Sequence, residues 1–132
     1  MIPAARPPER PSRATETESR RKRERSGHWS EAVAAIFLIA KGYRVIDRRW
    51  KSPLGEIDLI VTRGQRLAFV EVKRRRTIEA AEAAITDHQG DRIRRAADLW
   101  LARNARYQNH DICFDAVFVL PRRWPQHIED GF

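Results

Sequence analysis

Charged side chains interrupt two apolar segments of this chain, where a strand buried in a core would carry none. The segments span residues 55–61 and 67–73, and a short polar stretch containing Gly64 joins them. Both segments are rich in valine, isoleucine, leucine and phenylalanine, and glycine favours tight turns, so the pattern predicts a β-hairpin. Asp58 in the first segment and Glu71 in the second are the acids that could do chemistry there.

Alternation along each strand decides which charges meet. Side chains point to opposite faces at successive positions, so we expect Glu56 and Asp58 to share one face of the first strand. On the second strand we expect Glu71 and Lys73 to share a face. The opposite, apolar face of the first strand would carry Ile57, Leu59 and Val61.

A two-residue loop at positions 64–65 would place Asp58 opposite Glu71 and Glu56 opposite Lys73, with Cβ atoms about 4.5–5.5 Å apart. Like charges that face each other are destabilising, and a divalent cation between them would remove that cost. Mg²⁺ or Mn²⁺ fits, because such cations take oxygen ligands and one or two carboxylates; the carbonyl of Val72 could add a third oxygen. A one-residue slip of the register would send the charges to other neighbours.

The chemistry expected of such a site is hydrolysis of a phosphodiester. A cation there would make water a better nucleophile and stabilise charge on the phosphate. Lys73 could orient or deprotonate that water, or offset charge on the phosphate. The alternative is an exposed hairpin face on which cross-strand charges pair with one another.

The remaining polar residues give weaker signals. Glu31 lies near the start of a predicted helix on a side that could face the core, although an acid there usually offsets the helix dipole. Asp115 interrupts an apolar strand, where we expect a local hydrogen-bond acceptor. The single cysteine, Cys113, excludes an internal disulfide and is expected to be a small buried hydrophobic residue. Tryptophans are expected in or beside the core rather than as platforms on which bases stack. The histidines have no shared spacing and are expected at the surface: His28, His88, His110 and His127.

Composition points to a polyanionic partner. The chain has 132 residues, enough for one domain with a real core, and a net charge of +8. No apolar run is long enough to span a membrane, and the N-terminus has no signal-peptide pattern, so a cytoplasmic location is expected. The basic residues expected to hold a nucleic-acid backbone are Arg44, Arg48, Arg49, Lys51, Arg74, Arg75 and Arg76.

The predicted fold class is α/β, with a mixed sheet flanked by helices in the order α-β-β-β-α-β. We expect a disordered basic tail over residues 1–26, a domain over 27–121 and a polar tail over 122–132. The first helix should begin at Ser26 or Ser30 and end before Gly42. The other expected elements are a strand at 43–50, a short helix at 78–85, a break at 86–90, a helix at 91–106 and a strand at 112–120.

Several blocks of the sequence resemble the YraN family of small bacterial endonuclease-like proteins over residues 27–120. The blocks are Gly27-His28-Trp29-Ser30-Glu31-Ala32, Lys41-Gly42-Tyr43, Gly55-Glu56-Ile57-Asp58-Leu59-Ile60, Phe69-Val70-Glu71-Val72-Lys73-Arg74-Arg75 and Phe114-Asp115-Ala116-Val117. This resemblance implies a restriction-endonuclease-like core of the PD-(D/E)XK class, akin to archaeal Holliday-junction resolvases.

By that pattern Glu31 is the helix-borne acid, Asp58 the acid of the first motif, and Glu71 with Lys73 the E-x-K motif. Glu56 and Gln89 are supporting candidates, and Gln89 could position phosphate or water. Three positions depart from the pattern. Ile57 precedes the first acid where the class often has proline, Gln89 stands where the family usually has lysine, and Cys113 stands where it usually has arginine.

The sequence therefore predicts a Mg²⁺- or Mn²⁺-dependent nuclease acting on DNA. If its substrate were a branched junction, a symmetric homodimer would be favoured. A non-catalytic nucleic-acid-binding module with the same fold is the second hypothesis. A protein-interaction adaptor in DNA uptake or repair, with an incidental basic surface, is the third.

Overall fold

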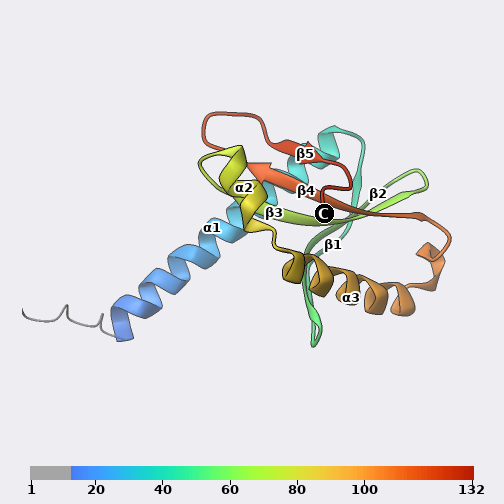
Figure 1. The fold of residues 1–132 in the computed structure, drawn as a ribbon, viewed down its shortest axis with the longest axis horizontal. Helices are drawn as coiled ribbons and strands as arrows, with labels where there is room; N and C mark the ends of the chain where they lie inside the picture. The colour runs from blue at the N-terminus through green and yellow to red at the C-terminus, as the bar shows by residue number, and fades with distance from the viewer. Residues whose placement is uncertain (1–12) are drawn as a thin grey trace, which may run out of the picture.

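A five-stranded mixed sheet with helices on both faces forms the body of the protein (Figure 1). The computed structural model describes residues 13–132, except for the side chains of residues 14–16 and 18–26. The helices are α1 (Arg13–Ala40), α2 (Ile78–Ala84), α3 (Asp87–Arg103) and the 3₁₀ turn η1 (Ala105–Tyr107). The strands are β1 (Arg44–Ser52), β2 (Gly55–Arg63), β3 (Arg66–Arg74), β4 (Asp111–Val119) and β5 (Gln126–Ile128).

The strand order is β1-β2-β3-β4-β5. The first three strands form antiparallel hairpins, whereas β3 and β4 are parallel. Parallel neighbours need a long crossover, and here α2, α3 and η1 supply it. The α/β class and the mixed sheet are therefore as predicted, and β3 lies inside the sheet with a partner on each side.

Two apolar clusters cover the two faces of the sheet. One cluster joins α1 to the sheet and includes Leu38, Tyr43, Leu59, Val70, Cys113 and Val117. The other joins α3 to the sheet and includes Ile57, Ile60, Phe69, Ile93 and Trp100. Because these residues are almost fully buried, polar groups of a site must lie where the clusters end. Cys113 is buried, as predicted.

The first helix is longer than the sequence predicted. It begins at Arg13 rather than at Ser26 or Ser30, and its first turns project beyond the sheet (Figure 1). Residues 14–25 are rich in glutamate and arginine, which favour helix, so a segment whose one apolar residue is Ala14 still continues α1. The rest of the predicted N-terminal tail, residues 1–12, lies outside the described residues. Gly42, with φ +96°, ends the helix as predicted.

The start of α3 also differs from the prediction. The break expected at residues 86–90 is the first turn of the helix, since Thr86 is its N-cap and its hydroxyl accepts the Gln89 N–H at 3.2 Å. Gly90 is buried, and a Cβ placed there would lie 3.6 Å from the Phe132 ring. At that distance a Cβ would make an ordinary van der Waals contact, so Gly90 is accommodated within the helix without being required by the packing of Phe132.

The C-terminal segment is not a polar tail. Residues Gln126–Ile128 form β5, which pairs antiparallel with β4. Phe132 packs against the clusters on the α3 side of the sheet. Few apolar residues mark this segment in the sequence, so its tertiary contacts, not its local pattern, decide its structure. None of the helices in the described part of the chain is both long and apolar enough to cross a membrane.

Candidate active site

The β2–β3 hairpin has the predicted register as far as its last pair. Arg63 lies opposite Arg66, and the pairing runs to Leu59 opposite Val70. Beyond that pair the strands part, and Asp58 Oδ2 accepts the Val72 N–H at 2.8 Å. The side chain of Asp58 thus takes a backbone donor of β3 at the point where β2 leaves it.

Two expectations about this strand were wrong. Glu56 lies opposite Lys51 of β1 and not opposite Lys73. Ile57 packs on the α3 side of the sheet while Leu59 packs on the α1 side, so these two residues do not share a face. The β1–β2 ladder leaves out Arg49, which has a φ of +46°, and the facing Asp58, while the register is the same on both sides of this gap and shifts only between Val45 and Asp47.

Glu71 and Lys73 form the charged centre of the site on the α3 side of β3. Lys73 Nζ lies 3.2 Å from Glu71 Oε1, and the same oxygen accepts the Gln89 side-chain N–H at 2.9 Å. Gln89 reaches it from the first turn of α3 because Thr86 caps that turn. The residue that stands where the family usually has lysine therefore orients the Glu71 carboxyl.

Burial raises the pKa of both acids at the point where the strands part. Loss of hydration is the largest cause of the raised pKa of Asp58, and the Val72 N–H and Lys73 oppose it. Burial, followed by the charge of Asp58, raises the pKa of Glu71 to about 8, although Lys73 lowers it. The predicted pairing of Asp58 with Glu71 lies beyond the last pair of the β2–β3 ladder, but Asp58 is close enough for its charge to raise the pKa of Glu71.

Glu31 joins the site from α1 and faces the core, as the sequence suggested it could. Only 7% of the residue is exposed. Burial and then the charge of Asp58 raise its pKa to about 7, while Arg49 lowers it. Arg49 Nε lies 3.2 Å from Glu31 Oε2, yet no group in the described part of the chain makes a well-aligned hydrogen bond to that buried oxygen. Glu31 therefore has an acceptor that a ligand could use.

The residues fit a small hard cation held by few protein ligands. Where side chains are described, no group of three or more His, Cys, Asp or Glu residues is arranged to hold a metal ion. Asp58 and Glu71 supply two oxygen-bearing side chains whose mutual repulsion a cation would relieve. Mg²⁺ is commonly bound by one or two carboxylates, with water and substrate phosphate completing its shell. The Val72 carbonyl as a further ligand stays a prediction.

The predicted basic residues divide into three places. Arg48, Arg49 and Lys51 lie on β1 near the acids, and Arg49 also contacts His28. Arg74, Arg75 and Arg76 follow Lys73 at the exit of β3 and are exposed. Arg44 lies at the other end of β1, opposite Thr62, so it is separate from the acids by about 16 Å of strand.

A family model described as "Uncharacterised protein family UPF0102" matches residues 30–119, which include every acid of the site. The chain belongs to the UPF0102 family. Its relative in Mesorhizobium japonicum is 49% identical over 114 residues, which cover 86% of this chain and 91% of the relative. The relative in Agrobacterium fabrum is 46% identical over 117 residues, covering 89% and 96%. UPF0102 is the same family as YraN, so that resemblance is confirmed at the level of the family. The names of these UPF0102 proteins state no activity.

Sequence reasoning missed some of the polar and aromatic structure around this site. His127 was expected at the surface, but only 2% of its side chain is exposed and its Nε2 lies 2.7 Å from Asp115 Oδ2. Trp29 and Trp124 were expected near the core, but both are exposed. Proline and arginine around Trp124 were the one available signal, because such a context disfavours a buried position.

Replacing Glu71 with glutamine should stabilise the metal-free protein at alkaline pH, by on the order of 1–3 kcal/mol. The pKa of Glu71 is raised from 4.5 to about 8 in the fold. The wild type therefore loses stability as the pH rises from about 4.5 through about 8, whereas glutamine does not titrate. Thermal unfolding in chelator across this range measures the difference. Glu79→Gln, an exposed acid of α2, is the matched control and should show no such trend.

Proposed function

We propose that this UPF0102 protein is a metal-dependent endonuclease that hydrolyses DNA phosphodiester bonds. The proposed site is of the restriction-endonuclease-like PD-(D/E)XK type. The observation that carries the proposal is the meeting of Asp58, Glu71 and Lys73 where β2 leaves β3. Two buried acids beside a lysine lower the stability of the metal-free fold. A bound cation would offset this cost, so such a pair indicates a functional site.

Each side chain has a role that follows from its contacts. Asp58 and Glu71 would hold Mg²⁺ or Mn²⁺, and Gln89 fixes the orientation of Glu71 through the 2.9 Å hydrogen bond. When bound, the cation supplies charge stabilisation at the phosphate and lowers the pKa of water. Lys73 lies beside Glu71 and can orient the attacking water or offset the charge of the phosphate. Glu31 offers a further acceptor on the α1 side.

The charge of the molecule supports a nucleic acid as substrate. The net charge of +8 and the exposed arginines on β1 and after β3 suit contacts to a phosphate backbone. Contacts of this kind position the substrate without reading its sequence. We infer DNA as the substrate and the cytoplasm as the place of action, and a homodimer if the DNA is branched.

Calorimetric titration with Mn²⁺ and with Mg²⁺ tests the metal site directly. The wild type should bind the cation, and the Asp58→Ala/Glu71→Ala double variant should not. The Glu79→Ala/Glu82→Ala variant removes the same charge from exposed positions of α2 and should bind like the wild type. Equal binding by wild type and the Asp58/Glu71 variant would remove the proposed site.

The second candidate function is binding of nucleic acid alone. It is favoured by the observation that the described side chains offer no group of three ligands for a metal. The protein would then bind nucleic acid without turnover. Binding in that case should weaken steeply with salt, while added Mg²⁺ or Mn²⁺ yields no cleavage product. Absence of cation binding by the wild type, together with salt-sensitive DNA binding, would favour this function over the nuclease.

A further inference from the structure

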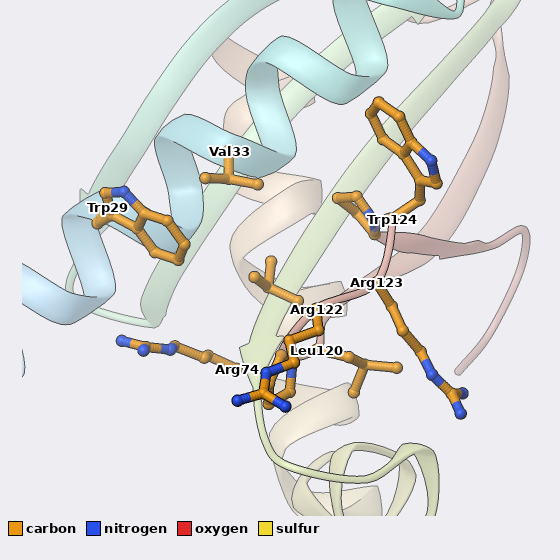
Figure 2. A pocket seen from close by; sticks show the side chains of 10 residues that line it. Trp29, Val33, Arg74, Leu120, Arg122, Arg123 and Trp124 are labelled. Carbon is orange, nitrogen blue, oxygen red and sulfur yellow. The ribbon is translucent and has the colours of Figure 1, made fainter.

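A groove opens beside the candidate site, on the side of the sheet that α1 covers (Figure 2). Its volume is about 440 Å³, within the usual range of ligand sites. The end of β4, the turn after it and the middle of α1 form its walls. The side chains used below are Trp29, Val33, Arg74, Arg122, Arg123 and Trp124.

Two indole rings flank this groove and are open to solvent. Trp29 is 55% exposed and Trp124 is 82% exposed. Figure 2 shows Trp29 and Trp124 on opposite sides of Val33. Tryptophan is usually largely buried, so two exposed rings at one groove indicate a binding surface. Flat aromatic faces that point into solvent suit stacking with another planar group.

Positive charge accompanies the rings. Arg74, Arg122 and Arg123 line the groove, and none of the described residues that line it is acidic. The guanidinium of Arg74 lies over the Trp29 ring, 5.2 Å from its centroid. Arg122 has a φ of +57°, a backbone conformation that is strained for any residue with a side chain.

The groove is continuous in sequence with the candidate site. Arg74 directly follows Lys73 on β3, and alternation along the strand sends the two side chains to opposite faces. Trp29 lies two residues before Glu31 on α1. The groove therefore lies next to the candidate site along β3 and α1, but on the opposite face of β3 from Glu71 and Lys73.

We propose that this groove binds an unpaired stretch of a nucleic-acid strand. Its bases stack on Trp29 and Trp124, and Arg74, Arg122 and Arg123 contact its phosphates. Proteins that bind single strands without sequence preference combine a basic groove with aromatic platforms in this way. A base inside a duplex has no face open for stacking, so the groove selects frayed, flapped, branched or single-stranded substrates. This selection deepens the nuclease function proposed above and rests on it, but the binding itself needs no turnover.

Fluorescence anisotropy in chelator tests the proposal without any cleavage. The probes are a labelled single strand of about 12 nucleotides and the blunt duplex of the same sequence. Trp29→Ala/Trp124→Ala should weaken single-strand binding by roughly 10- to 100-fold and change duplex binding little. Trp29→Phe/Trp124→Phe keeps aromatic faces and should retain most of the affinity.

Charge is controlled separately. Arg122→Gln/Arg123→Gln should weaken single-strand binding more than Arg95→Gln/Arg103→Gln, which removes the same charge from exposed positions of α3. The assay in chelator measures binding alone, so a nuclease that fails to cleave and a groove that fails to bind give different results.

Two results would overturn the proposal. One is that the wild type does not bind the single strand, or that Trp29→Ala/Trp124→Ala binds it as tightly as the wild type. The other is a wild-type dimer, seen by light scattering, that this variant converts to monomers with no loss of oligonucleotide binding. That result would assign the groove to contacts between two copies of the chain.

Discussion

Asp58→Asn is expected to lower the rate of metal-dependent DNA cleavage by at least about 10³-fold, since metal stabilisation of transition-state charge is worth several kcal/mol. The substitution is nearly isosteric. Its side-chain oxygen can still accept the Val72 N–H, which Asp58 accepts at 2.8 Å. The fold should therefore survive while the negative charge that would attract the cation is lost.

Cleavage of a labelled DNA substrate at saturating Mg²⁺ and at saturating Mn²⁺ measures this effect. Glu79→Asn, at an exposed position of α2, controls for the loss of one acidic charge and should cleave at the wild-type rate. The nuclease hypothesis fails if Asp58→Asn, with an unchanged unfolding temperature, cleaves as fast as the wild type.

Asp115→Asn is expected to destabilise the fold by about 3–5 kcal/mol, the usual cost of removing one partner of a buried ion pair. Asp115 is fully buried and accepts both guanidinium N–H groups of Arg66, the second at 2.7 Å. His127 Nε2 and the Asp130 N–H also donate to it, at 2.7 and 2.9 Å. Because Lys41 can only donate to His127 Nδ1, the Nε2 atom carries the proton that Asp115 accepts.

The effect of Asp115 on stability should depend on pH. Burial opposes its ionisation, but the hydrogen bonds from Arg66 and His127 outweigh burial and lower the pKa from 3.8 to about 2. A group whose pKa is lowered by folding stabilises the fold at pH values above its pKa in the unfolded chain. This stabilisation is lost as the pH falls through its pKa in the folded protein. The wild type should lose its advantage over Asp115→Asn between about pH 4 and pH 2.

Urea unfolding at several pH values checks both parts of this prediction. Asp111→Asn, at the exposed start of the same strand, is the control. A difference in stability that stayed constant down to the lowest pH would show that the charge of Asp115 contributes nothing.

The regular parts of the fold were predictable because local pattern and tertiary structure agree there. The turn at 64–65 set the register of β2 and β3, and Ile60 lies opposite Phe69 as expected. Gly42 ends α1 as expected. Where local pattern and packing disagree, prediction failed. Gly90 signals a break but lies inside α3, whose first turn Thr86 caps, and β5 forms by pairing with the edge of β4.

The site was predictable in its composition but not in its geometry. The pattern around Asp58, Glu71 and Lys73 placed these residues on the strands that the structure shows, whereas their role as a site stays a prediction. The departure of β2 from β3 could not be predicted, because it involves a side chain, the Asp58 carboxyl, that takes the place of a strand partner of Val72. The role of Gln89 was missed for a similar reason. Its contact with Glu71 links residues 18 apart in the chain through the cap of α3.

The Val72 amide gives the acids of the site a built-in spectroscopic reporter. Its proton points to a carboxylate and not to a strand carbonyl. The chemical shift of an amide proton depends on the charge of its acceptor, so this resonance should follow the ionisation of Asp58 and any cation that draws on its other oxygen. A titration followed by nuclear magnetic resonance at the Val72 amide would then report cation binding to the site. The neighbouring amides of β3, which are bonded within the sheet, provide an internal reference.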